Sequence, residues 1–114
     1  MSRYARKMTP EGSITKSIRD LLRTLGIFHW KQFQSLGSPP GIPDIIGIYQ
    51  GIPLFLEIKT SIGKLSVYQK GFLANVNLHG GLGVVLRNID DAIELINGLK
   101  NGKDLSDLRQ RFQS

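Results

Sequence analysis

Three side chains that could act together on a phosphate ester are Asp44, Glu57 and Lys59. Side chains alternate along a strand, so in the predicted strand 53–59 Glu57 and Lys59 share one face, while Leu54, Leu56 and Ile58 take the other. A tight turn at Gln50-Gly51 predicts an antiparallel hairpin with residues 44–49. Its register places Asp44 opposite the Glu57 region, so the three groups should meet at one edge of a sheet.

Two carboxylates and a lysine beside a basic surface predict a divalent-metal site for phosphodiester hydrolysis. We expect Mg²⁺, with Mn²⁺ as a possible substitute, bound by Asp44, Glu57 and the carbonyl oxygen of Ile58. Lys59 would orient or help to deprotonate the attacking water, or stabilise the charge that develops on the phosphate. Pro43 fixes the approach of the chain to Asp44.

The elements that must position these residues follow from periodicity and from capping signals. Thr9 and Pro10 predict the start of a helix that Gly26 ends. Residues 27–35 read as a strand and 36–43 as a Gly/Pro loop, and the hairpin follows. Ser66 and Gln69 form a capping-box pattern for a helix over 66–79. Residues 82–86 predict a buried strand, and Asn88 caps a further helix.

This order predicts an α/β fold with an αβββαβ core, in which helices flank a mixed four-stranded sheet. We expect a basic flexible arm over residues 1–8, a single domain over 9–100, and a helical or frayed tail over 101–114. The apolar side of the last helix, with the tail, is the expected surface of a dimer.

Composition narrows the class of protein. The chain has 114 residues, 40% of them hydrophobic, which suits one globular domain. The absence of cysteine excludes disulfide scaffolds and thiol nucleophiles. No apolar run is long enough to span a membrane. The net charge of +6 favours nucleic acid as the partner, although basic charge can also simply keep a protein soluble. With no export signal apparent, we expect a cytoplasmic protein.

The sequence resembles the PD-(D/E)XK nuclease superfamily and, within it, the VRR-NUC family with its small stand-alone phage and bacterial members. The residues that carry the resemblance are Gly41-Ile42-Pro43-Asp44, Glu57-Ile58-Lys59-Thr60, Gly63-Lys64-Leu65-Ser66 and Gln69. The family's Val-Arg-Arg signature is matched only by Val84-Val85-Leu86-Arg87. The likeness extends over roughly residues 9–97.

The resemblance implies a restriction-endonuclease-like core and metal-dependent endonuclease activity on DNA. It implies that Asp44 and Glu57 are metal ligands and that Lys59 is the catalytic lysine. Glu11 would help to hold a metal directly or through water, and Gln69 would line the active site. Small stand-alone members are thought to dimerise and to cut four-way (Holliday) junctions, which implies a homodimer acting on branched DNA.

Several simpler interpretations stay open. Glu57 and Lys59 could form a weak ion pair on a solvated strand face. Glu11 could only complement the dipole of its helix, and Gln69 could only cap. Lys31, Lys64 and Lys70 are candidates for phosphate contact. The rival functions are a flap, nick or duplex nuclease of a phage or restriction-like system, and a nucleic-acid-binding module without catalysis.

Overall fold

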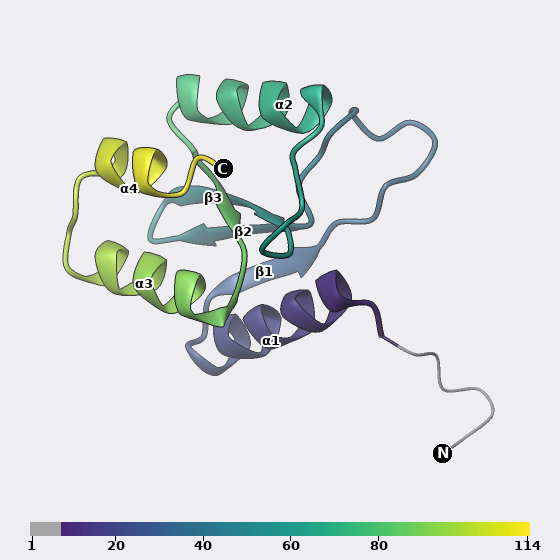
Figure 1. Ribbon diagram of the computed structural model, residues 1–114. Helices are drawn as coiled ribbons and strands as arrows, with labels where there is room; N and C mark the ends of the chain where they lie inside the picture. Colours follow the sequence, from purple (N-terminus) through teal and green to yellow (C-terminus); the bar gives the residue numbers. More distant parts are fainter. Residues whose placement is uncertain (1–7) are drawn as a thin grey trace, which may run out of the picture.

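The computed structural model describes residues 8–114, so the basic arm expected at residues 1–8 lies, apart from Met8, outside the described part. Four helices and four strands follow one another along this part of the chain (Figure 1). Their bounds are α1 Pro10–Thr24, β1 Phe28–Lys31, β2 Ile45–Tyr49, β3 Ile52–Ile58, α2 Val67–Leu78, β4 Leu82–Leu86, α3 Ile89–Lys100 and α4 Leu105–Arg111.

The four strands form one mixed sheet in the order β1-β2-β3-β4. β1, β2 and β3 are antiparallel neighbours, and β4 runs parallel to β3 because α2 makes the crossover between them. Ile45 pairs with Leu56, so Asp44, one residue earlier, lies opposite Glu57. The α/β architecture and the hairpin register predicted from the sequence are therefore confirmed.

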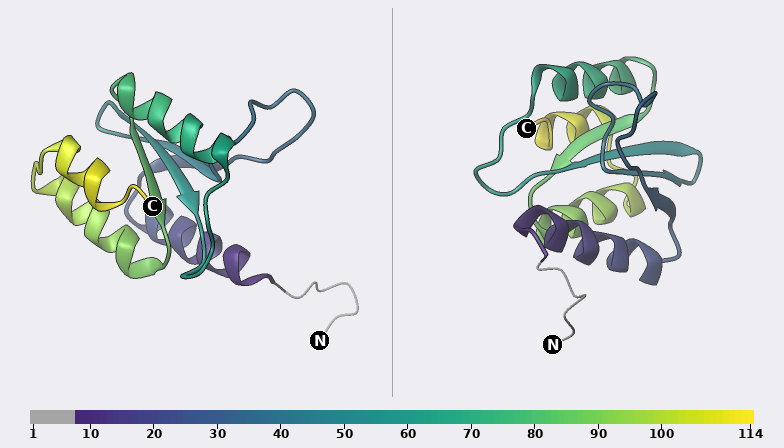
Figure 2. Two further views of the ribbon diagram at one scale, coloured as in Figure 1. Left: turned by 45° about the horizontal axis from the view of Figure 1, so that its top comes forward. Right: turned by 90° about the vertical axis from the view of Figure 1, so that its right-hand side faces the viewer.

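One face of the sheet carries the core. Figure 2 shows α1 and α3 lying together below this face. Ile18 and Leu22 of α1, spaced one helical turn apart, are almost completely buried against it. The inward residues of β3 and β4 and the apolar side of α3 complete the same cluster. Thr9 accepts a hydrogen bond from the Gly12 N–H, so the predicted start of α1 is confirmed.

The first strand is shorter than expected. Residues 27–35 were predicted to be extended, but pairing covers only Phe28–Lys31 because the partner strand β2 begins at Ile45. The Gln32 N–H still donates to the Asp44 carbonyl oxygen at 2.7 Å. This bond ties the end of β1 to the residue that precedes β2.

Residues 101–114 contain an ordered helix that belongs to the core. α4 packs beside β4 and α3, and Leu108 and Phe112 are 1% and 3% exposed. The Val85 N–H donates to the Phe112 carbonyl oxygen at 2.8 Å, so the end of the chain also covers part of the β4 edge. The prediction that the apolar side of the last helix and the tail form a dimer surface is therefore wrong, because the apolar sides of α3 and of the tail are buried inside this chain.

The other face of the sheet is only partly covered. α2 packs over β4, and its Phe72 meets Phe55 of β3. Beyond that contact the sheet presents a surface that we call the open sheet face. By register it comprises Phe28, Trp30, Ile46, Ile48, Pro53 and Phe55. Phe28 is 66% exposed and Trp30 is 41% exposed. Within residues 8–114 no helix has the length and apolar character needed to cross a membrane.

Candidate active site

Asp44 is held at the start of β2 by a hydrogen bond across the hairpin. Its Oδ2 accepts from the Ile58 N–H at 2.8 Å. Pro43, which precedes it, is buried and fixes the direction from which the chain enters the strand. One carboxylate oxygen is thus fixed by the backbone of β3, next to Glu57.

Glu57 is a buried carboxyl group. Its side chain is 3% exposed. By alternation it shares a face of β3 with Phe55 and, just beyond the end of the strand, with Lys59. Burial is the main cause that raises its pKa from 4.5 to about 9, and the neighbouring Asp44 raises this pKa further through its charge and through a shared hydrogen bond. The opposing effect of Lys59 is smaller. Two acidic groups are therefore held together with too little positive charge nearby to balance them.

Lys59 lies at the C-terminal end of β3 with its Nζ 4.0 Å from Glu57 Oε2. Its side chain is 13% exposed, and its backbone N–H donates to the Leu86 carbonyl oxygen at 3.1 Å. The interpretation of Glu57 and Lys59 as a solvated surface pair is wrong, because both side chains are withdrawn from solvent. Lys59 is close enough to act on a group bound at the carboxylates.

Gln69 both caps α2 and hydrogen-bonds to Glu57. Its Oε1 accepts from the Ser66 N–H at 2.9 Å, and the Ser66 hydroxyl accepts from the Gln69 N–H, which completes the capping box of α2. Its Nε2 donates to Glu57 Oε2 at 3.3 Å. Because Oε1 must face an N–H, the cap fixes the orientation of the amide and points its donor at Glu57.

Glu11 lies near this site but outside its centre. Its negative charge contributes to the raised pKa of Glu57. Within residues 8–114, however, no three His, Cys, Asp or Glu side chains come close enough together to hold a metal ion. Glu11 thus does not join Asp44 and Glu57 in a ready three-carboxylate cage.

The chemistry of the donor set fits Mg²⁺. Asp44 and Glu57 offer hard carboxylate oxygens, and Mg²⁺ is commonly bound by one or two carboxylates while it keeps several waters. The carbonyl oxygen of Ile58 lies on the residue between Glu57 and Lys59. A divalent cation would also supply the positive charge that the two adjacent carboxyl groups lack.

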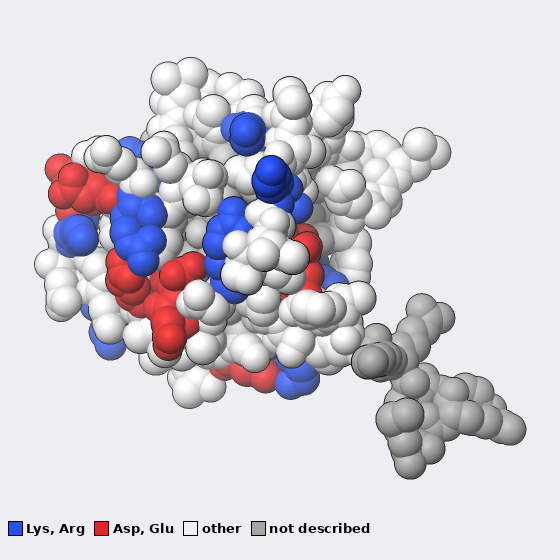
Figure 3. Space-filling model, in the orientation of Figure 1, with Lys and Arg blue, Asp and Glu red and all other residues white. Residues whose placement is uncertain are grey.

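The three lysines proposed for phosphate contact are placed differently. Lys31 ends β1 directly beside Ile45, and its Nζ lies 4.7 Å from the centre of the Phe33 ring. Lys64 is exposed on the loop after β3. Lys70 follows Gln69 but lines a separate hollow with Leu73 and Gln113. On the face shown in Figure 3, basic side chains are interspersed with acidic ones instead of forming one continuous basic surface.

Two positioning residues were not recognised from the sequence. The Arg87 guanidinium donates to the carbonyl oxygens of Thr60 and Gly63, so it holds the loop that follows Lys59. Gly41 has a φ of +76°, and a Cβ there would lie 2.4 Å from the backbone of Tyr68. For Arg87, the sequence offered one indication, which is that an arginine directly follows a strand predicted to be buried. Gly41 belongs to the Gly/Pro loop recognised from the sequence, but no local pattern indicated its close approach to Tyr68.

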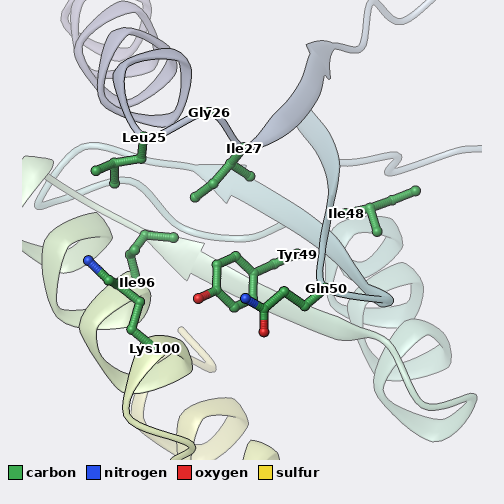
Figure 4. Close-up of a pocket in the computed structure, with 8 residues that line it drawn as sticks. All are labelled: Leu25, Gly26, Ile27, Ile48, Tyr49, Gln50, Ile96 and Lys100. Atoms are coloured by element: carbon green, nitrogen blue, oxygen red, sulfur yellow. The ribbon is translucent and has the colours of Figure 1, made fainter.

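A cavity of about 300 Å³ is shown in Figure 4. It is lined by the end of α1, by Tyr49 and Gln50 at the turn between β2 and β3, and by Ile96 and Lys100 of α3. This turn is at the opposite end of β2 from Asp44. The cavity contains no carboxylate and is separate from the candidate active site.

Comparison with known proteins identifies the architecture. No protein-family model and no curated protein matches the sequence. Among solved structures, a VRR_NUC domain superposes on this chain with a TM-score of 0.68 and 24% sequence identity. The match covers 78% of this chain and 96% of that one. The chain has the VRR-NUC fold.

This structural match confirms the architecture that the sequence resemblance implied. That architecture is a nuclease-type fold. Within it, Asp44, Glu57, Lys59 and Gln69 come from β2, β3 and α2 and meet at one end of the sheet. Glu11 and Lys31 lie at the margin of this group, whereas Lys70 is directed elsewhere.

Proposed function

We propose that this protein is a metal-dependent DNA endonuclease that hydrolyses phosphodiester bonds in branched DNA. The observation that supports this most strongly is the buried carboxyl group of Glu57 beside the half-buried carboxyl group of Asp44, within reach of the Lys59 amine. A purely structural site would seldom keep two acids together in this way, because burial and mutual repulsion both disfavour their charged forms.

Each residue has a defined part in this proposal. Asp44, Glu57 and the Ile58 carbonyl would hold Mg²⁺, which supplies neutralisation of phosphate charge and a more acidic water molecule when it is bound. Lys59 stabilises negative charge that develops on the phosphate oxygens, or orients the attacking water. Gln69 fixes the side chain of Glu57 through its Nε2. Arg87 holds the loop after Lys59 through its hydrogen bonds to the carbonyl oxygens of that loop.

Action as a homodimer is supported by the open sheet face. Four-way junctions are symmetric and need two cuts, whereas each chain carries one candidate site. None of the side chains of the open sheet face is charged, and its exposed aromatic residues are of the kind enriched in protein interfaces. Paired cutting requires a second copy of the chain, and we propose that this copy packs against the open sheet face.

The cleavage experiment uses labelled four-way junction, flap and plain duplex DNA with Mg²⁺, Mn²⁺ or EDTA. Glu57→Ala and Lys59→Ala are compared with Glu94→Ala and Lys103→Ala, which truncate the same residue types at exposed positions. We expect metal-dependent cutting of the junction that only the first pair of variants loses. Cutting of flaps or duplex instead would keep the site and change the substrate. Binding of DNA without cutting in any metal would contradict the enzyme.

Sedimentation tests the homodimer separately. The Ile48→Glu variant places a charge in the open sheet face at a position that is 47% exposed, so the fold of the monomer should tolerate it. We expect wild-type dimer and variant monomer. A wild-type protein that sediments only as a monomer, with and without DNA, would contradict paired cutting.

A further inference from the structure

A groove separates α1 from β1 on the side of the sheet that carries the core. Two adjoining hollows form it, of about 450 and 380 Å³, and both are lined by Arg19 and Arg23. Lys31, Gly12 and Thr15 line the first hollow, whereas Phe28 and His29 line the second. Figure 2 shows α1 running alongside the sheet in this region. We call it the α1 groove.

The α1 groove is strongly basic. Lys16, Arg19, Arg23 and Lys31 line its first hollow, and Asp20 is the only acidic residue there. Asp20 is already paired with Lys16 at 2.8 Å and with Arg23 at 3.0 Å. Most of the positive charge therefore has no counter-charge among the lining residues.

Unpaired polar atoms mark the same groove. Within residues 8–114 just two buried side-chain nitrogen or oxygen atoms lack a hydrogen-bond partner, and these are Arg19 Nε and His29 Nε2. The other ring nitrogen of His29 bonds the Ile27 carbonyl oxygen at 2.9 Å. A buried N–H without an acceptor is costly, so Arg19 lacks the anionic or carbonyl oxygen that its N–H requires.

The α1 groove lies next to the candidate active site, although none of the residues of that site lines it. Gly12 and Thr15 line it one turn or less from Glu11, whose charge reaches Glu57. Lys31 pairs with Ile45, the residue after Asp44. From Gly12 to Arg23 the helix rises about 16 Å, which along the axis of a duplex is the length occupied by about five phosphates of one strand. The groove thus extends away from the neighbourhood of Glu11 along a path that suits a nucleic-acid backbone.

We propose that the α1 groove binds the phosphate backbone of DNA next to the cut, with Arg19 as the residue that anchors a phosphate. The proposal rests on the nuclease function proposed above and assigns it a substrate-binding surface. Arg19 donates from its terminal nitrogens to one phosphate. Arg23 and Lys31 contact neighbouring phosphates on either side of it, and Lys16 adds charge at the rim.

Affinity for labelled duplex DNA, measured by fluorescence anisotropy in EDTA over a range of salt concentrations, tests this assignment. The Arg19→Ala/Arg23→Ala protein is compared with Lys100→Ala/Lys103→Ala, which removes two charges from exposed positions on and after α3. We expect the first double variant to bind at least about tenfold more weakly and to lower the slope of log affinity against log salt by about two. The control should change affinity less than about twofold.

The Arg19→Lys variant separates charge from geometry. It keeps the positive charge but loses the planar set of donors, so its affinity should fall between wild type and Arg19→Ala. Thermal unfolding verifies that each variant is folded. Equal weakening by both double variants, or no measurable binding by wild type, would overturn the groove assignment. Because binding is measured without metal, the affinity result can be interpreted even if the protein does not cleave DNA. Normal cleavage together with unchanged affinity in Arg19→Ala/Arg23→Ala would overturn the groove assignment and leave the proposed nuclease function intact.

Discussion

The buried carboxyl group of Glu57 should make this protein less stable as the pH rises. The pKa of Glu57 is raised from 4.5 to about 9 in the folded chain, mainly by burial and next by Asp44. Below the pKa of the unfolded chain, Glu57 is protonated in both states, so it does not lower the free energy of unfolding. Between the two values the unfolded chain releases the proton but the folded chain keeps it, so the free energy of unfolding falls as the pH increases.

The size of this effect follows from the shift. Each unit of pKa difference corresponds to about 1.4 kcal/mol, so the full cost above the folded pKa approaches about 6 kcal/mol. From about pH 6 to about pH 8 the metal-free protein should lose about 2 to 3 kcal/mol. A small domain is stable by about 5 to 15 kcal/mol in total, so this loss is large enough to measure.

The Glu57→Gln variant should remove this pH dependence. Its neutral amide can accept from Gln69 and donate to Asp44 without a charge to bury. We expect urea unfolding in EDTA to give a free energy that falls with pH for wild type and stays nearly level for the variant. Glu94→Gln, at an exposed position, should behave as wild type. Mg²⁺ should restore wild-type stability at the higher pH and leave Glu57→Gln unchanged. Equal pH slopes for wild type and Glu57→Gln would refute the reasoning.

Three further outcomes are expected. Gly41→Ala should cost about 2 to 4 kcal/mol in the free energy of unfolding, because its Cβ meets the Tyr68 backbone, whereas Gly37→Ala, also at positive φ but in open space, should cost about 1 kcal/mol in the same urea titration. Arg87→Lys should lower single-turnover cleavage about tenfold with DNA affinity unchanged, because one ammonium cannot hold both loop carbonyls as the guanidinium does; equal loss of affinity would contradict a positioning role. Leu108→Ala should cost about 2 to 5 kcal/mol by thermal unfolding, and exposed Leu78→Ala should cost under about 0.5 kcal/mol.

Much of the fold could be predicted because local signals were strong and agreed with one another. Thr9 and Ser66 are caps whose partners lie within three residues, and the Gln50-Gly51 turn fixes the register of the hairpin. That register alone was enough to bring Asp44 opposite Glu57. The positions of these two residues therefore depended on contacts close along the chain.

What could not be predicted depends on contacts between distant segments. Glu57 is buried by tertiary packing and contacted by Gln69 of α2, and nothing in the alternation of β3 distinguishes a buried acid from a solvated one. The order in residues 101–114 comes from Phe112 bonding back to Val85. Likewise Arg87 reaches Thr60 across 27 positions of the sequence, a distance over which single-sequence patterns carry no signal.

The double use of Gln69 restricts what can occupy that position. A capping box accepts either glutamate or glutamine at its third position, and the helix alone would not distinguish them. Here the second end of the side chain faces Glu57, so glutamate would still cap α2 but would bring a third acid to a pair that already lacks positive charge. The preference for an amide over a carboxylate at this helix terminus is thus set by the carboxyl groups of the candidate active site. Helix initiation and site chemistry therefore cannot be tuned independently in this protein.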